Sequence, residues 1–341
     1  DLAYAETCAA IGLVFWAHRM LQFEGDGKYA DVMERALYNG VLSGVSLEGD
    51  KFFYANPLEA IPALHEARPD LFGKDAVSYT RQDWFSCACC PPNLARLVAS
   101  LGRYIYSESE GGEAQNDSPK EDSTHIPGIY VHLYVGGSGT FDVNGQEVAL
   151  SQETRYPWEG EVTITVQPET QMRFALALRV PAWSREATLQ VNGQPVDVAS
   201  QLERGHVKIE RMWESGDRVI LNLPMPVERV EAHPSVGEDC GRVAIQRGPL
   251  VYCLEEVDNG PDLHDIVLPA DSALQATFEG DLLGGIVAIE GEARRRDWEQ
   301  WGDALYRSTP SALETAPIKA IPYYAWANRG PGEMLVWLQQ G

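Results

Sequence analysis

Four residues in two short strings carry the side chains best suited to chemistry. Glu6 and Cys8 stand in the string AETCA, and Cys89 and Cys90 stand in the string FSCACCPPN. Two adjacent cysteines pair with each other only in a strained ring, so free thiolates or a bound metal explain them better than a local disulfide. Together the four side chains would offer three sulfur ligands and one oxygen ligand, a set suited to zinc.

Spacing alone does not decide what this set of ligands does. The long separation between the two strings matches no common zinc finger. From the residues alone, cysteines packed in a helical core, a closed structural zinc site and a catalytic site all remain open. Cys240 and Cys253 lie in strand-like surroundings and are expected to be small buried side chains.

The local sequence predicts how the two strings could converge. The Pro-Pro dipeptide after Cys90 predicts a helix start, because proline is tolerated in a first helical turn. Cys89 and Cys90 would precede that helix, where free N–H groups and the helix dipole lower a thiol pKa. Inside a helix Glu6 and Cys8 would lie on different faces, since two residues advance about 200°. They could share one ion only at an irregular helix start.

The elements that would position these strings are helical in the first hundred residues. Apolar spacings of three and four predict helices around 14–21 and 29–41, the first of them ending at Gly25. A third helix is predicted from position 91 towards 106. Because three such helices make a poor core by themselves, residues 1–108 are predicted to be the last part of a larger helical domain.

The rest of the chain has the patterns of a linker and of β-structure. Charge, Gly and Ser dominate a segment that predicts a flexible linker or loop at 109–124. Beyond it apolar residues alternate with a period of two, at 129–135, 162–166, 174–180 and 219–223. Asn144-Gly145 and Asn192-Gly193 predict tight hairpin turns. We expect a β-sandwich domain over 125–235, and a second one or a continuation over 236–341.

Composition limits the partners and the location of the protein. The 341 residues, 44% hydrophobic, are enough for two or three domains, and the net charge of −23 argues against nucleic acid or an anionic membrane surface as partner. No run approaches the length of a membrane span. The chain opens at Asp1 without a Met and enters a helical pattern at once, so we expect an upstream part, where any signal peptide would lie. The expected location is cytoplasmic.

Several strings, in this order, resemble the bacterial β-L-arabinofuranosidases of glycoside hydrolase family 127 and its close relatives. They are AYAETCA, YADVMERALYNGVLSGVSLEG, FFYANPLE, WFSCACCPPNLARLVASLGRYIY, VAIQRGPLVYCLE and IPYYAWANRGPGEMLVWL. The resemblance covers nearly the whole chain, and CACCPPN together with the upstream ETC is its most specific part. It implies a multidomain α + β fold, in which the C-terminal helices of an (α/α)6 catalytic barrel are followed by two β-sandwich domains.

The resemblance also implies an activity and a zinc cofactor. It implies a retaining glycoside hydrolase that acts on β-L-arabinofuranosides or related L-furanosides of plant glycans, with a zinc-bound cysteine as nucleophile. Matched by motif, the zinc ligands are Glu6, Cys8, Cys89 and Cys90, and Cys89 is the nucleophile. Zinc and the helix start would both keep its thiol deprotonated.

Further roles follow from the same resemblance. Glu34 in MERALYN and Tyr54 in FFYANP match positions that the family uses to bind the sugar. The family's acid/base Glu lies shortly before the ETC motif, upstream of Asp1. Residues 1–341 by themselves are therefore expected to be inactive as a glycosidase.

A second class of function stays open beside the glycosidase. A non-catalytic carbohydrate-binding module or a structural zinc module would need only part of these features. Metal content separates a glycosidase from a pure binding module, which holds no zinc. A structural zinc module also holds zinc, but its site is closed, without a cleft over Cys89. The expected partner is an oligosaccharide or glycoside substrate, with no nucleic acid and no membrane, and a homodimer through a β-sandwich is the expected assembly.

Overall fold

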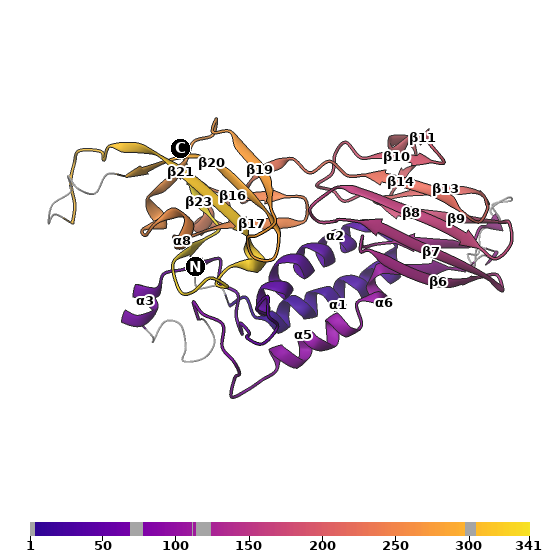
Figure 1. The fold of residues 1–341 in the computed structure, drawn as a ribbon, viewed down its shortest axis with the longest axis horizontal. Coiled ribbons are helices and arrows are strands. Elements are labelled where there is room, and N and C mark those ends of the chain that lie inside the picture. Colours follow the sequence, from indigo (N-terminus) through magenta and orange to yellow (C-terminus); the bar gives the residue numbers. More distant parts are fainter. Residues whose placement is uncertain (1–3, 69–77, 111, 114–123, 297–304) are drawn as a thin grey trace. The chain divides into compact units, whose positions relative to one another are not determined.

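The computed structural model divides the chain into two compact units. It describes residues 4–68, 78–110, 112–113, 124–296 and 305–341 (Figure 1). Unit 1 comprises Asp1–Gly12, Arg35–Ala95 and Pro226–Gly341, and unit 2 comprises Leu13–Glu34 and Arg96–Met225. The domain boundaries expected from the sequence stay predictions. Most of the expected linker at 109–124 lies outside the described residues.

Helices lie in the described part of the first hundred residues where the apolar spacing predicted them, except that the helix predicted from 91 towards 106 is two helices, Cys90–Ala99 and Gly102–Ile105. The α-helices in the described residues of this region are α1 (Thr7–Glu24), α2 (Gly27–Arg35), α3 (Pro62–Ala67), α5 (Cys90–Ala99) and α6 (Gly102–Ile105). Helix α1 ends at the predicted glycine, because Gly25 has a φ of 64° that side-chain-bearing residues rarely adopt. The pattern at 29–41 is not one regular helix, since α2 passes into a π-helical turn at Ala36–Val41.

Unit 2 holds two main sheets in its described residues. Their strand orders are β11-β10-β14-β8-β7-β6 and β12-β13-β9-β5-β2, and β3 pairs with β4. The strands are β2 (Tyr106–Ser109), β3 (Gly112–Glu113), β4 (Thr124–His125), β5 (Gly128–Val131), β6 (Gly137–Val143), β7 (Gln146–Thr154), β8 (Glu161–Pro168), β9 (Met172–Arg179), β10 (Thr188–Val191), β11 (Gln194–Val196), β12 (Leu202–Glu203), β13 (His206–Trp213) and β14 (Asp217–Asn222). Short helix α7 (Val198–Gln201) joins β11 to β12. Neighbours are antiparallel except β5 and β9, which run parallel.

Both predicted hairpin turns are confirmed. Asn144 and Gly145 have φ values of 55° and 78° and join β6 to β7. Asn192 and Gly193, at 51° and 76°, join β10 to β11. The Asn-Gly dipeptide fixes these turns locally, because it supplies two consecutive positive φ angles.

Strand β9 forms the centre of the core of unit 2. Its five consecutive residues Phe174–Leu178 are all 0% exposed, so both faces of the strand are covered. The next residue, Arg179, is also 0% exposed. A charged side chain at such a position requires buried partners.

Unit 1 contains a larger sheet in its described part. Its strand order is β1-β22-β17-β21-β20-β18-β23-β16-β15, with β19 paired to β20. The strands are β1 (Glu59–Ala60), β15 (Val227–Glu231), β16 (Arg242–Arg247), β17 (Leu250–Glu255), β18 (Ile266–Leu268), β19 (Leu274–Glu279), β20 (Ile286–Arg296), β21 (Leu313–Pro322), β22 (Met334–Leu335) and β23 (Leu338–Gln340), and helix α8 (Glu256–Asn259) follows β17.

The two remaining cysteine predictions in unit 1 have opposite outcomes. Cys253 lies within β17 and is 2% exposed, as expected. The prediction for Cys240 is wrong, because this residue follows a short 3-10 turn ahead of β16 and is exposed. None of the helices in the described residues combines the length and the apolar character that a membrane crossing requires.

Candidate metal centre

The structure brings Glu6, Cys8, Cys89 and Cys90 together within unit 1. One ligand atom from each lies within 4.8 Å of the others. The Sγ atoms of Cys89 and Cys90 are 3.7 Å apart, and they lie 3.7 and 3.9 Å from Oε1 of Glu6. Tetrahedral sulfur ligands about 2.3 Å from an ion are about 3.8 Å from one another. The separations among Glu6, Cys89 and Cys90 therefore fit a metal centre, and Cys8 lies near enough to be its fourth ligand.

An irregular helix start makes Glu6 and Cys8 converge. Glu6 lies one residue before α1, in an isolated antiparallel bridge with Ala55. Cys8 lies in the first turn of α1. In a continuous helix the two side chains would point to different faces. The change from extended to helical backbone between Glu6 and Cys8 lets them point to the same side. The structure thus meets the condition that the sequence set for a shared ion.

The other two thiols lie at the start of α5. Cys90 is its first residue and is 1% exposed, whereas Cys89 directly precedes it and is half-buried. The expected lowering of the thiol pKa is wrong for Cys90, because burial raises its pKa and outweighs the hydrogen bond with the backbone of Cys8 that lowers it. Burial also raises the pKa of Cys8, and a hydrogen bond with Asn93 opposes that rise.

Tyr54 lies against the candidate nucleophile. Its hydroxyl oxygen is 3.2 Å from Sγ of Cys89, and its ring packs edge-on against Phe85 with centroids 5.4 Å apart. The contact with Cys89, followed by burial, raises the pKa of Tyr54. In the structure the thiol of Cys89 donates to this hydroxyl oxygen, and the phenol, which keeps its proton at neutral pH, donates in turn only where the thiol has lost its own.

Phe53, the residue before Tyr54, is held between two side chains. Trp326 stacks on its ring with centroids 4.7 Å apart, and the guanidinium of Arg81 lies 4.6 Å from its centroid. Arg81 also donates to the carbonyl oxygens of Ser43 and Trp326, at 3.1 and 2.6 Å. Burial lowers the pKa of Arg81 to about 10. These contacts fix the segment that carries Tyr54.

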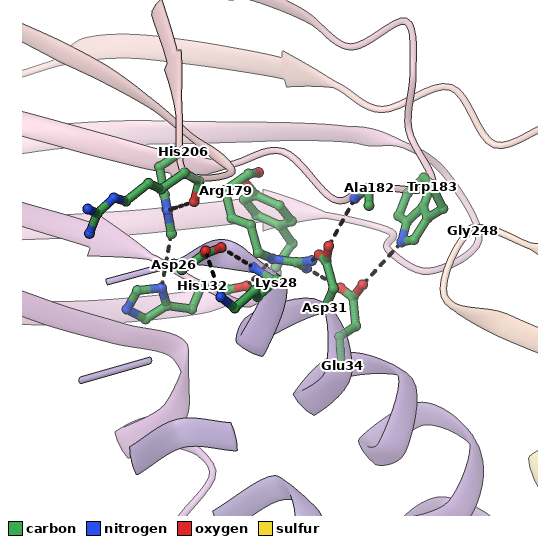
Figure 2. A network of polar contacts seen from close by, with 12 residues as sticks. Asp26, Lys28, Asp31, Glu34, His132, Arg179, Ala182, Trp183, His206 and Gly248 are labelled. Carbon is green, nitrogen blue, oxygen red and sulfur yellow. Dashed lines mark hydrogen bonds and ion pairs between the residues drawn. The ribbon is translucent and has the colours of Figure 1, made fainter. Parts of the chain in front are cut away.

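Glu34 belongs to unit 2 and has a different environment (Figure 2). It is 1% exposed, and Oε1 accepts a 2.5 Å hydrogen bond from Tyr156 and forms an ion pair with Arg179. Its other oxygen accepts a hydrogen bond of 3.2 Å from Nε1 of Trp183. Both carboxylate oxygens thus have protein partners. These contacts favour a structural role, and the sugar contact implied by the resemblance stays a prediction.

Arg179 links Glu34 to a second carboxylate. Its guanidinium donates to Oδ1 of Asp31 at 2.6 Å and to the carbonyl of His132 at 2.6 Å (Figure 2). Asp31 also accepts a 3.2 Å hydrogen bond from the amide of Ala182. Burial raises the pKa of Asp31, while Arg179 opposes that rise. The whole cluster ties α2 to the end of β9.

Sequence reasoning missed the buried polar residues beside the cluster. Thr7 and Ser43 are 0% exposed and Asn56 is 2% exposed, and all three hydrogen-bond with one another or with adjacent backbone. The available signal was the position of Thr7 between two candidate ligands. Nothing in the sequence marks Ser43 or Asn56 as its partners.

The fold is that of a multidomain α/β protein. Three thiols and a carboxylate gathered at two helix starts give it a candidate metal centre. Comparison with family profiles identifies the domains. Residues 1–103 match the catalytic domain of the β-L-arabinofuranosidases of glycoside hydrolase family 127, residues 128–225 its middle domain and residues 227–339 its C-terminal domain. The chain belongs to glycoside hydrolase family 127.

Individual relatives support the same assignment. A non-reducing end β-L-arabinofuranosidase from Bifidobacterium longum is 39% identical, over 99% of this chain and 49% of that protein. A crystal structure of a family 127 β-L-arabinofuranosidase from Geobacillus stearothermophilus T6 is 52% identical with a TM-score of 0.92, and the match covers 100% of this chain and 51% of that one. A further family 127 β-arabinofuranosidase structure is 36% identical with a TM-score of 0.84, over 99% and 50% of the two chains. The chain spans about half the length of these relatives.

Proposed function

We propose that this chain is part of a retaining glycoside hydrolase that cleaves β-L-arabinofuranosides or related L-furanosides of plant glycans. Membership of family 127 supports the reaction class. The observation that carries the mechanism is the cluster itself, in which Cys89 lies between a carboxylate, a second thiol and the phenol of Tyr54. A thiol at the position of Cys89 can act as the nucleophile, so the mechanism requires no carboxylate nucleophile.

The donor set fits zinc. Three sulfurs and one carboxylate oxygen within 4.8 Å of one another match the ligand types that zinc prefers in proteins, and the separations among Glu6, Cys89 and Cys90 are close to tetrahedral ones. Glu6, Cys8, Cys89 and Cys90 would hold the ion. When bound, zinc would keep the thiols deprotonated at neutral pH, which burial alone opposes at Cys8 and Cys90.

Cys89 is the proposed nucleophile. Its Sγ attacks the anomeric carbon, the C1–O bond to the leaving group breaks, and a thioglycosyl enzyme forms. The acid/base carboxyl that the resemblance places before Asp1 protonates the leaving oxygen and later takes a proton from the attacking water. The second displacement at C1 releases Cys89 and restores the configuration. Tyr54 orients Cys89 by its hydrogen bond.

The finer fold and the alternative function belong to the same proposal. From the family we propose that α1, α2 and α5 are the last helices of an (α/α)6 barrel over 1–108, followed by β-sandwich domains over 125–235 and 236–341. A non-catalytic carbohydrate-binding or structural zinc module is the alternative. The half-buried state of Glu6, Cys8 and Cys89 favours an open zinc site over a closed one. The β-sandwich homodimer and the cytoplasmic location stay predictions.

Cys8→Ala is expected to abolish zinc binding in the full-length protein. Elemental analysis should find about one zinc per chain in the wild type, and only a small fraction of that in the variant, because loss of one of four ligands leaves an incomplete site. Cys87→Ala is the matched control, since Cys87 is exposed and lies in the same string but outside the cluster. Equal zinc content in wild type and Cys8→Ala would remove Cys8 from the ligand set.

Tyr54→Phe is expected to lower kcat/KM roughly 10- to 100-fold, the worth of one hydrogen bond to a charged group. The phenyl ring keeps the packing against Phe85, so the melting temperature should change little. Steady-state kinetics on an aryl β-L-arabinofuranoside measures the effect. Tyr79→Phe is the control, because that hydroxyl donates to Glu66 and not to the cluster. Wild-type kinetics in Tyr54→Phe would mean that the phenol does not act on Cys89.

A further inference from the structure

Thr7 stands between two candidate metal ligands and is held at both its backbone and its side chain. Its amide donates to the carbonyl of Tyr54 at 2.9 Å. Its hydroxyl donates to the carbonyl of Phe53 at 2.8 Å and accepts a 2.9 Å hydrogen bond from Nδ2 of Asn56. Thr7 is 0% exposed, so water does not compete for these hydrogen bonds. The residue that joins Glu6 to Cys8 is thus attached to the segment 53–56 at three points.

Asn56 is itself held in one orientation. Its Oδ1 accepts a hydrogen bond of 2.8 Å from the hydroxyl of Ser43, and its backbone amide donates to the carbonyl of Ala5 at 2.8 Å. With a donor fixed at Oδ1, the amide nitrogen must face Thr7. The direction of the bonds therefore runs from Ser43 to Asn56, from Asn56 to Thr7, and from Thr7 to the backbone of Phe53.

Close packing at Gly44 restricts Thr7 further. A Cβ atom at position 44 would lie 2.6 Å from Cγ2 and 2.9 Å from Oγ1 of Thr7, which is nearer than real Cβ contacts allow. The φ of Gly44 is not in the left-handed region, so glycine is needed for this close approach and not for backbone freedom. Thr7 consequently has little room to move towards that side.

We propose that Thr7, Asn56 and Ser43 are positioning residues of the metal centre, and that they fix the relative placement of Glu6 and Cys8. The inference rests on the proposed function, since it takes the cluster as a zinc site. Thr7 is covalently joined to both ligands, and two ligands at a helix start converge only if the backbone between them keeps its one irregular conformation. Outer partners that orient metal ligands typically contribute 10- to 100-fold in metal affinity.

The test compares Thr7→Val with Thr7→Ser in the full-length protein. Valine keeps the shape and removes the hydroxyl, whereas serine keeps the hydroxyl and removes the methyl group. Zinc affinity is measured by competition with a chelator of known affinity, and the Co2+-substituted protein is measured by its thiolate-to-metal absorption. We expect roughly 10- to 100-fold weaker Zn2+ binding and a shifted Co2+ spectrum for valine, and near wild-type values for serine.

A stability control separates positioning from folding. Asn39 is 7% exposed and hydrogen-bonds to the backbone of Arg35, Pro249 and Val251. Asn39→Ala should lower the melting temperature and leave Zn2+ affinity unchanged. If Asn39→Ala weakens Zn2+ binding as much as Thr7→Val does at equal loss of melting temperature, the effect is general destabilisation and the inference is wrong.

A second variant tests the same inference without removing any polar group. Gly44→Ala should displace Thr7 and weaken Zn2+ binding, whereas Gly12→Ala, whose Cβ would meet nothing within 4 Å, should not. Wild-type affinity in both Thr7→Val and Gly44→Ala would overturn the positioning role while leaving the zinc site intact. A wild-type protein without affinity for Zn2+ would instead overturn the proposed function, and the positioning role with it.

Discussion

Replacing Cys89 by serine is expected to lower kcat of the full-length enzyme by at least about 10³-fold, since loss of a nucleophile removes the covalent pathway. A serine hydroxyl keeps the shape of the side chain but is far less acidic than a thiol, so the attacking anion is scarcely populated at pH 7. Loss of turnover should exceed any loss of fold. Kinetics on an aryl β-L-arabinofuranoside, circular dichroism and zinc content measure the three quantities separately.

Covalent labelling locates the nucleophile directly. A cyclophellitol-like epoxide with the L-arabinofuranose configuration should modify the wild-type protein, and peptide mass spectrometry should place the adduct on Cys89. The adduct should be absent from Cys89→Ser and present in Cys87→Ser, whose exposed thiol lies outside the cluster. An adduct on a carboxylate such as Glu34 would mean a conventional carboxylate nucleophile and would contradict the thiol mechanism.

The features that the sequence predicted are the locally determined ones. The end of α1 at Gly25 and the two Asn-Gly hairpins depend on φ angles that a few adjacent residues impose. Helix geometry predicts that Glu6 and Cys8 can bind one ion only if the helix start between them is irregular, and the structure has such a start. The ETC and CACCPPN strings indicate the family because each string is specific by itself, although the two are far apart in the sequence.

The features that the sequence left open depend on burial and on contacts between distant residues. Cys240 and Cys253 were both expected to be buried, yet only Cys253, which lies in the apolar run LVYCL, is buried, whereas Cys240 stands among charged residues and glycines in GEDCGR. The pKa of the Cys90 thiol is raised where the helix start predicts a lowered one, because the helix start is visible in the sequence and the depth of burial is not. Thr7 looks like any helix-start threonine until Asn56, distant in the chain, is placed beside it.

Glu34 is the residue at which the family motif and the structure suggest different roles. The motif places it near the sugar, whereas the structure engages both its oxygens with Arg179, Tyr156 and Trp183. The ion pair is buried on both sides, with Arg179 at 0% and Glu34 at 1% exposure. A buried ion pair adds little net stability over an apolar pair, but breaking it by removing one partner is costly.

Glu34→Ala is therefore expected to lower the free energy of unfolding by about 3–5 kcal/mol, because it leaves the charge of Arg179 without its buried partner. Urea denaturation measures the change. Asp31→Asn is the graded comparison and should cost less, since Asp31 is 23% exposed and Glu34 would still neutralise Arg179. The double variant Glu34→Met with Arg179→Met should be more stable than Glu34→Ala, because it removes both charges and fills the space. A role in binding the sugar would give the opposite pattern. Glu34→Ala would then raise KM or lower kcat. The free energy of unfolding would stay within about 1 kcal/mol of the wild type, as expected for a carboxylate whose ion pair adds little to stability.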